Sequence, residues 1–303
     1  MRQTTVGVPR LPFVAFAAFT DWHSLGERLS SKGQYTAVSF FKFAKRDRER
    51  PVTDSAQLTS LKNKLLALDV KGTLLVAANE GYNGAFCVPS RKLGSFYDAL
   101  VATDAALFSD LDLNVGQSLN VSDPEKLPFK KLIVKQKKAV LTDGFSDEMA
   151  GEMDFTDAGE ELEPEAWHSE LSGSTKPILI DCRNDYESHM GTFDGAIGLN
   201  TTTFAESWER LDKLLENVDK DARILTFCTG GIRCIKTNAW LKQKRGMTNS
   251  GRLKKGIIHY EQWLESLGAD ANSLSLFNGE NFLFDRRRMF EQSTTDEQST
   301  SSS

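Results

Sequence analysis

The chain has 303 residues and a formal net charge of −5, with 40% hydrophobic and 26% charged residues. This balance is typical of a globular protein of about two domains, and no run of about 18 apolar residues predicts a membrane-spanning helix. Eight prolines and 22 glycines exclude collagen-like and wholly disordered chains. Because the net charge is negative, a nucleic-acid site must be a local basic patch.

Residues 1–33 are expected to form a disordered or targeting segment. Arg2 and Arg10 flank the start of a short apolar run at 11–19, but no small-residue cleavage site follows it. The four cysteines are too few for a disulfide scaffold in a chain of this length. We therefore expect a reducing, cytoplasmic location, or an organelle if the first residues are a transit peptide.

Residues 34–142 alternate between strand and helix patterns in the order βαββαβ, which predicts an α+β domain of the ferredoxin-like type. Asp54 and Ser90 stand at N-cap positions before two apolar helical patterns. The sequence NEGYNG at 79–84 predicts a tight turn. The expected strands cover 36–44, 72–78, 85–88 and 111–121, and the expected helices cover 54–68 and 90–100.

The charge changes sign after this domain. The stretch 126–138 is basic and interleaved with apolar residues, which suits contact with RNA phosphates or, equally, an amphipathic strand with solvated lysines. Eleven acids and no Lys or Arg occupy 143–170, so we predict an acidic linker over 143–172. The candidate RNA-binding residues are Lys130, Lys131, Lys135, Lys137 and Lys138.

Residues 173–270 predict an α/β domain with a parallel sheet, because apolar strands alternate with amphipathic helices. A C-terminal extension over 271–303 follows, and its Ser, Thr, Gln and acidic residues predict disorder from about 291. The expected strands cover 177–181 and 223–227, and the expected helices cover 205–218, 234–244 and 257–267.

The loop after the strand at 223–227 carries the reactive chemistry. The strand delivers Cys228 to the carboxyl edge of the sheet, where active sites of open α/β sheets lie. The small residues that follow let backbone N–H groups turn toward one point, and a helix begins directly after them. These donors and the charge of Arg233 lower the pKa of the Cys228 thiol below about 8.5, which makes it a nucleophile at neutral pH. The predicted active-site loop consists of Cys228, Thr229, Gly230, Gly231, Ile232 and Arg233.

This loop is compact. Cys228 and Arg233 enclose four residues, one fewer than in the phosphate-binding loops of cysteine phosphatases, so the loop suits a persulfide or another small group. The structural alternative is a buried cysteine beside a glycine turn. Cys234 is either a candidate resolving thiol or a packing residue. Cys87 and Cys182 lie in or beside apolar strands and are expected in the core.

The stretch 179–200 resembles the opening strand and loop of rhodanese domains. The residues that match are Asp181, Arg183, Glu187, Gly191, Gly195, Ala196 and Ile197. In that family such residues connect the start of the sheet, and Cys228 stands at the position of the rhodanese nucleophile. The resemblance implies a rhodanese-like fold for the second domain.

A narrower resemblance covers about residues 35–290. CTGGIRC at 228–234, NEGYN at 79–83, PFKKLIVKQKK at 128–138 and GENFLFDRRR at 279–288 together resemble the rhodanese-containing tRNA uridine hydroxylases. This resemblance implies conversion of the tRNA wobble uridine to 5-hydroxyuridine, with molecular oxygen as co-substrate and the anticodon region of tRNA as partner. It assigns catalytic roles to Cys228 and Arg233.

Members of that family often end in a cysteine-rich segment, whereas this chain ends in serine, so we expect no metal site. No cofactor and no membrane partner are evident. The leading hypothesis is a tRNA-modifying enzyme in which the Cys228 thiolate adds to C6 of the uracil. The alternatives are a sulfurtransferase that carries a persulfide on Cys228 and a non-catalytic RNA-binding module. The oligomeric state is left open.

Overall fold

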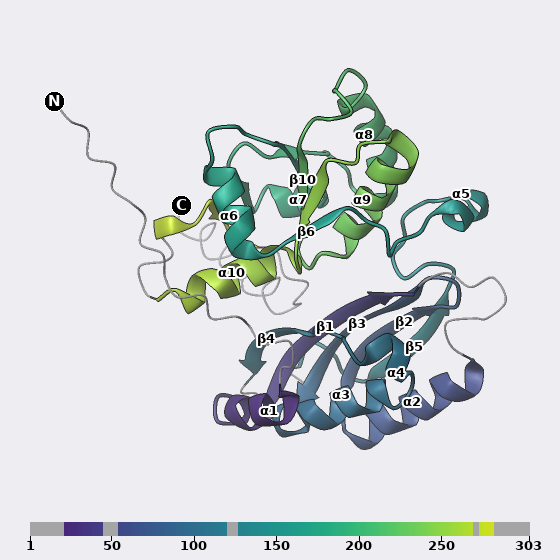
Figure 1. Ribbon diagram of the computed structural model, residues 1–303. Coiled ribbons are helices and arrows are strands. Elements are labelled where there is room, and N and C mark those ends of the chain that lie inside the picture. The colour runs from purple at the N-terminus through teal and green to yellow at the C-terminus, as the bar shows by residue number, and fades with distance from the viewer. Residues whose placement is uncertain (1–20, 45–53, 120–126, 269–272, 282–303) are drawn as a thin grey trace, which may run out of the picture.

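The computed structural model describes residues 21–44, 54–119, 127–268 and 273–281, which form two α/β domains, one stacked on the other (Figure 1). Within these ranges no helix is long and apolar enough to cross a membrane.

The first domain is built on a five-stranded sheet of order β4-β1-β3-β2-β5. β1 pairs antiparallel with β3 and β4, and β2 pairs antiparallel with β3, which confirms the predicted ferredoxin-like arrangement. The basic stretch adds a fifth strand, β5, parallel to β2 at the edge of the sheet. The strands are β1 (Tyr35–Phe43), β2 (Lys71–Ala77), β3 (Gly81–Pro89), β4 (Asn114–Leu119) and β5 (Leu132–Lys137).

The helices of this domain cover one face of the sheet (Figure 1). Leu61, Phe40, Phe86 and Phe96 lie in the apolar cluster between these two layers. Asp54 caps α2 through a capping box with Gln57, as the sequence predicts. The helices are α1 (Trp22–Ser30), α2 (Ser55–Ala67), the 3-10 turn η1 (Ser90–Lys92), α3 (Leu93–Val101) and α4 (Ala105–Phe108).

The structure differs from the expectation for residues 1–33. Asp21 caps α1 through its side chain, and Trp22 is buried in the core cluster, so this part of the segment belongs to the domain. The amphipathic pattern of α1 is too short to identify a helix from sequence, because its stability comes from packing on α3 and η1. Residues 1–20, to which the targeting expectation also applies, lie outside the described residues.

Two local details of the first domain also differ. The expected turn at 79–84 is shorter, because β3 already begins at Gly81. Gly81 has φ of +142°, and a Cβ there would lie 2.0 Å from the carbonyl oxygen of Lys42. Only glycine therefore fits at this position, where β3 pairs with β1. Ser90 is not an N-cap: its buried hydroxyl donates to the carbonyl of Gly33 at 2.7 Å.

The second domain contains a parallel sheet of order β6-β11-β10-β7-β9, which confirms the predicted fold class. The helices α8 and α9 cover one face of this sheet and α6 and α10 cover the other (Figure 1). A short antiparallel pair joins β8 to β12, so the C-terminal extension begins as ordered chain. Its tail from 291, expected to be disordered, lies outside the described residues.

The strands are β6 (Glu160–Leu162), β7 (Ile178–Asp181), β8 (Gly191–Phe193), β9 (Ile197–Gly198), β10 (Ile224–Phe227), β11 (Ser250–Leu253) and β12 (Phe277–Gly279). The helices are α5 (Asp147–Glu152), α6 (Pro164–Ser172), α7 (Asp185–Ser188), the 3-10 turn η3 (Phe204–Glu206), α8 (Ser207–Leu214), α9 (Ile232–Arg245) and α10 (Gly256–Ser266).

The acidic segment 143–172 is ordered, in contrast to the expected linker. It forms α5, the edge strand β6 and α6, and Trp167 is fully buried. Cations from distant parts of the second domain pair with seven of its eleven acids, and a linear sequence does not show these partners. These ion pairs are Asp143–Lys236, Glu152–Lys244, Asp157–Lys242, Glu160–Arg223, Glu170–Arg223, Glu161–Arg252 and Glu163–Lys254.

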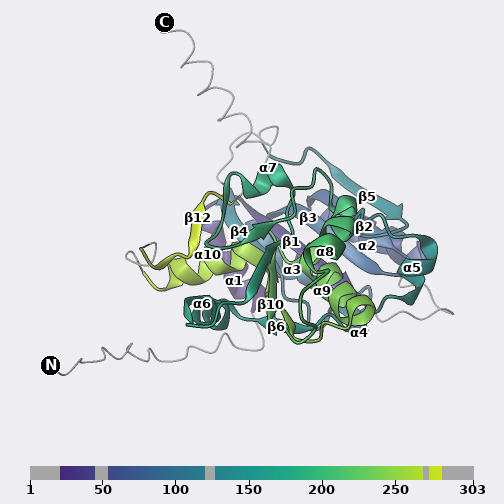
Figure 2. The ribbon, with the colours of Figure 1, turned by 90° about the horizontal axis from the view of Figure 1, so that it is seen from above.

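The second domain lies on the face of the first sheet that has no helices (Figure 2). Phe43 and Ala77 from that face belong to the same apolar cluster as residues of α8 and α9. A fully buried cation, Lys236 of α9, bonds across this interface to Glu80 and also pairs with Asp143. Its ammonium also lies 4.3 Å from the ring centroid of Phe155.

Lys236→Met tests this interface. The substitution leaves two buried carboxylates without their cation, so we expect it to lower the free energy of unfolding by about 3–5 kcal/mol in denaturant titrations. Lys242→Met is the matched control on α9, because its pair with Asp157 is half exposed and contributes less than about 1 kcal/mol. Equal stability of the two variants would show that the buried triad does not hold the domains together.

Candidate active site

Cys228 lies directly after β10, at the carboxyl edge of the parallel sheet where the sequence places it. Gly231 is the N-cap of α9, with φ of +97°, and its N–H donates to Sγ of Cys228 at 3.1 Å. The thiol is fully buried, with 0% of Cys228 exposed. The expected inward-facing N–H donor is therefore present, but the sulfur has no open route to solvent.

The pKa of Cys228 results from opposing effects. Burial raises the pKa of the thiol, because a charge in the interior loses its hydration. A hydrogen bond from the Cys234 thiol, the charge of Arg233 and the N–H groups of Cys234 and Gly231 outweigh burial and lower the pKa to about 6. Cys228 is thus largely a thiolate at neutral pH.

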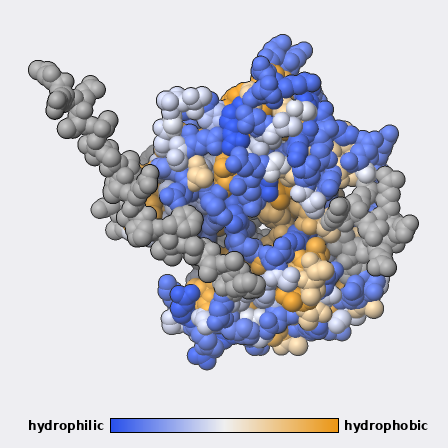
Figure 3. Space-filling model, in the orientation of Figure 1, coloured by the Kyte–Doolittle hydropathy of each residue, from blue (hydrophilic) through white to orange (hydrophobic). Residues whose placement is uncertain are grey.

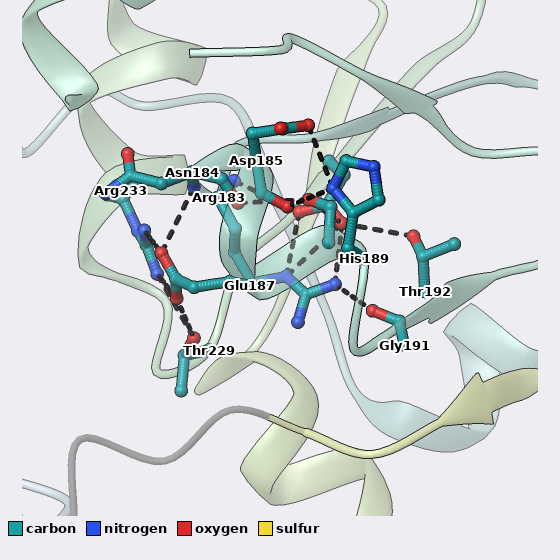
Figure 4. A network of polar contacts seen from close by, with 11 residues as sticks. Arg183, Asn184, Asp185, Glu187, His189, Gly191, Thr192, Thr229 and Arg233 are labelled. Atoms are coloured by element: carbon teal, nitrogen blue, oxygen red, sulfur yellow. Dashed lines mark hydrogen bonds and ion pairs between the residues drawn. The ribbon is translucent and has the colours of Figure 1, made fainter. Parts of the chain in front are cut away.

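Arg233 acts on this thiolate through its charge, while its hydrogen bonds go elsewhere. The guanidinium donates to both carboxylate oxygens of Glu187, at 2.5 and 2.8 Å, and to Oγ1 of Thr229 at 3.1 Å (Figure 4). Thr229 in turn donates to Glu187 at 3.0 Å. Burial raises the pKa of Glu187, but the Arg233 contacts outweigh burial and lower the pKa below its ordinary value. The network ties the loop to α7.

The carbonyl groups of Cys228 and Thr229 are paired with the start of α10. The N–H groups of Ile257 and Ile258, at the start of α10, donate to the carbonyls of Cys228 and Thr229 at 3.0 and 3.2 Å. This pairing fixes the two peptide planes that precede the 230–231 peptide, whose N–H faces Sγ.

The first domain covers the loop from the other side. A Cβ at Gly231 would lie 3.3 Å from the ring of Phe41 in β1, and Asn114 of β4 lies next to Gly230. Lys255 fixes this contact, because its ammonium pairs with Asp112 at 2.5 Å and donates to the carbonyl of Leu113 at 3.0 Å. Figure 3 shows hydrophobic residues gathered where the two domains meet.

Three of the four cysteines lie together. Cys182 follows β7 as Cys228 follows β10, and the preceding residues Asp181 and Phe227 are register partners in the sheet. Cys234, in the first turn of α9, hydrogen-bonds to both Cys228 and Cys182. Cys87 lies apart in the core of the first domain. Burial and the neighbouring Cys182 and Cys228 sulfurs raise the pKa of Cys234 well above its ordinary value.

The predicted lysines lie on and beside β5 at the edge of the first sheet. All five candidates are exposed, and Lys138 pairs with Asp147 at 3.3 Å in a solvent-exposed contact. They lie on the first domain, separate from the Cys228 loop. The candidates are Lys130, Lys131, Lys135, Lys137 and Lys138.

Sequence reasoning missed several residues that shape the site. Glu187 was matched as a rhodanese residue, but its pairing with Arg233 was not foreseen, although a buried arginine always requires a partner. The contacts of Phe41, Lys255 and Lys236 at the domain interface were also not foreseen, because they have no local pattern in the sequence. In the described part of the chain no group of three or more His, Cys, Asp or Glu side chains could hold a metal ion.

The chain matches two family models. Residues 35–140 match the UPF0176 acylphosphatase like domain and residues 165–265 match the rhodanese-like domain. A tRNA uridine(34) hydroxylase of Legionella pneumophila is 35% identical over 84% of this chain and 90% of its own length. One from Acaryochloris marina is 36% identical over 84% of this chain and 73% of its own length. A rhodanese-like domain from Anabaena is 17% identical, covers 40% of this chain and 79% of that chain, and has a TM-score of 0.30.

Gly231→Ala tests the geometry of the loop. Because φ of Gly231 is +97° and the new Cβ would press on Phe41, we expect a loss of stability of about 1–2 kcal/mol and a higher pKa of Cys228 as the N–H moves from Sγ. Gly230→Ala is the matched control, because its nearest neighbour lies at 3.9 Å and its φ is not positive. Denaturant titration and thiolate absorbance at 240 nm measure both effects. If the pKa of Cys228 in Gly231→Ala equals that in the unaltered protein, the assigned role of this N–H is contradicted.

Proposed function

Because the chain belongs to the tRNA uridine(34) hydroxylase family, we propose that it hydroxylates uridine 34 of tRNA at C5, with Cys228 as the nucleophile and molecular oxygen as oxidant. Similarity over 84% of the chain to relatives of that name, together with the N–H···S geometry at Cys228, supports this proposal. A tRNA substrate agrees with the expected cytoplasmic location.

The Cys228 thiolate suits addition to an electron-poor carbon. Addition of sulfur to C6 of the uracil pushes electron density to C5, and C5 then reacts with oxygen. Two electrons from a thiol donor split the resulting peroxide, so that one oxygen stays on C5 and the other leaves as water. Loss of the C5 proton with departure of the sulfur from C6 then restores the ring as 5-hydroxyuridine. The low pKa of Cys228 aids both steps, since it supplies the thiolate and makes it a good leaving group.

Because Cys228 is buried, the uridine reaches it only when the covering contacts part. Phe41 and the pair formed by Lys255 and Asp112 are contacts between the first domain and this part of the second domain. We propose that binding of tRNA to the first domain separates these contacts and admits the base. Closure around the bound base then excludes water from the reacting carbon.

The sulfurtransferase alternative is less well supported. The compact loop suits a persulfide, but the relatives that match both domains carry the hydroxylase name. A sulfurtransferase also has no need of the first domain or of the lysines on β5.

The anticodon region of the tRNA is proposed to lie along β5. Five exposed lysines near one edge strand give a local positive patch on a chain of net charge −5. Lysine contacts to phosphates release counterions, so the affinity for tRNA falls as salt increases.

Cys228→Ser tests the catalytic role. We expect the yield of 5-hydroxyuridine to fall at least about a thousand-fold, because the serine hydroxyl is not ionised at neutral pH. The measurement is mass spectrometry of nucleosides from undermodified tRNA incubated in air with purified protein. Cys87→Ser, in the core of the first domain, is the control and should retain activity. Unchanged modification by Cys228→Ser would refute the proposal.

The combined substitution of Lys135, Lys137 and Lys138 by Gln tests the binding patch. We expect weaker tRNA binding and a slope of log affinity against log salt that is smaller by about 2. Lys213→Gln with Lys220→Gln, which removes exposed charges from the second domain, is the control. If the two sets of variants show the same salt slope, the patch does not contact the phosphates.

A further inference from the structure

Cys234 interacts directly with the Cys228 sulfur, which a residue that only fills space would not need to do. Cys228 and Cys234 belong to the same buried cluster, both side chains are 0% exposed, and the Cys234 thiol interacts with the Cys228 thiolate. Its backbone N–H is also directed to the Cys228 sulfur. The first turn of α9 therefore fixes a second thiol against the nucleophile.

The proposed hydroxylation needs more than oxygen. One atom of O₂ enters C5 of the uracil, and the other leaves as water, which requires two electrons from a donor. Two thiols that join in a disulfide supply two electrons. The paired sulfurs of Cys228 and Cys234 lie where this oxidation would occur.

We propose that Cys234 is a second catalytic residue, which together with Cys228 supplies the two electrons of the reaction and ends in a Cys228–Cys234 disulfide. This inference rests on the proposed hydroxylase function. The overall reaction consumes uridine, O₂, one proton from solvent, the Cys228 thiolate and the Cys234 thiol. It produces 5-hydroxyuridine, water and the disulfide. The O–O, C5–H and S–H bonds break. The C5–O, S–S and water O–H bonds form.

The protonation states of the two sulfurs suit these roles. Cys228 is held as the thiolate that adds to the base, whereas Cys234 keeps its proton because burial, Cys182 and Cys228 raise its pKa. Once Cys228 has lost its charge by bonding, one cause of the raised pKa of Cys234 disappears. Cys234 then ionises more readily and takes the outer oxygen of the peroxide at C5 onto its sulfur, which breaks the O–O bond. Cys228 leaves C6 as the ring is restored, and its thiolate displaces hydroxide from the Cys234 sulfur to form the S–S bond.

Burial of the pair has a further consequence. A dithiol reductant must regenerate the thiols before the next turnover, and it reaches them only when the contacts of Phe41 and Lys255 part. Between turnovers the closed domains shield both sulfurs from solution oxidants.

The test is a single turnover without added reductant. The fully reduced protein, freed of reductant without air, is mixed with undermodified tRNA and then exposed to air. We expect about one 5-hydroxyuridine and one disulfide per chain. Trypsin cleaves after Arg223, Arg233 and Lys236, so the disulfide appears as a link between peptides 224–233 and 234–236. A dithiol added in a parallel sample should restore repeated turnover.

Cys234→Ser should lower the yield of product without reductant at least tenfold while tRNA binding is unchanged, and Cys87→Ser should behave as the unaltered chain. Three results would overturn the role of Cys234 and leave the hydroxylase function standing. They are product without the 228–234 link, a link from Cys234 to Cys182 in its place, and full yield in Cys234→Ser. No product from the unaltered chain, even with dithiol present, refutes the hydroxylase function itself. The disulfide is measured on the unaltered chain, so this result does not depend on the folding of the variant.

Discussion

Much of the site is arranged around one buried negative charge, the thiolate of Cys228. A charge in the interior is costly unless donors and an opposite charge compensate it. Here the N–H of Gly231 and the cation of Arg233 do so, and Arg233 is itself neutralised by buried Glu187. Removing any one of these groups leaves another without its partner. This mutual dependence explains why the loop, α7 and the start of α9 form one unit.

The first domain is part of the active site rather than an attached module. A ferredoxin-like sandwich has helices on one face of its sheet, and here the other face covers the Cys228 loop through Phe41 and Asn114. Lys236 extends the connection from α9 to Glu80 and Asp143. Movement of the first domain relative to the second would therefore change the cover over the Cys228 loop.

The sequence was informative where structure is local. The Asp54 cap, the strand before Cys228 and the glycine turn after it depend on residues close in the chain, and the structure confirms them. The acidic segment was interpreted wrongly because β6 exists only by pairing with β11, which follows nearly a hundred residues later. The burial of Cys228 was also not predictable, since Phe41 and Lys255 come from elements far apart in sequence.

The most direct test of the central claim is the titration of Cys228 in the unaltered protein. Carbon-13 NMR of protein labelled at cysteine Cβ follows each thiol without requiring access to the buried sulfur, and Cys228→Ser assigns the signal. A midpoint of about 6 for Cys228 is the expected result. A midpoint near the value of about 8.5 for a free cysteine would contradict a thiolate stabilised by the loop.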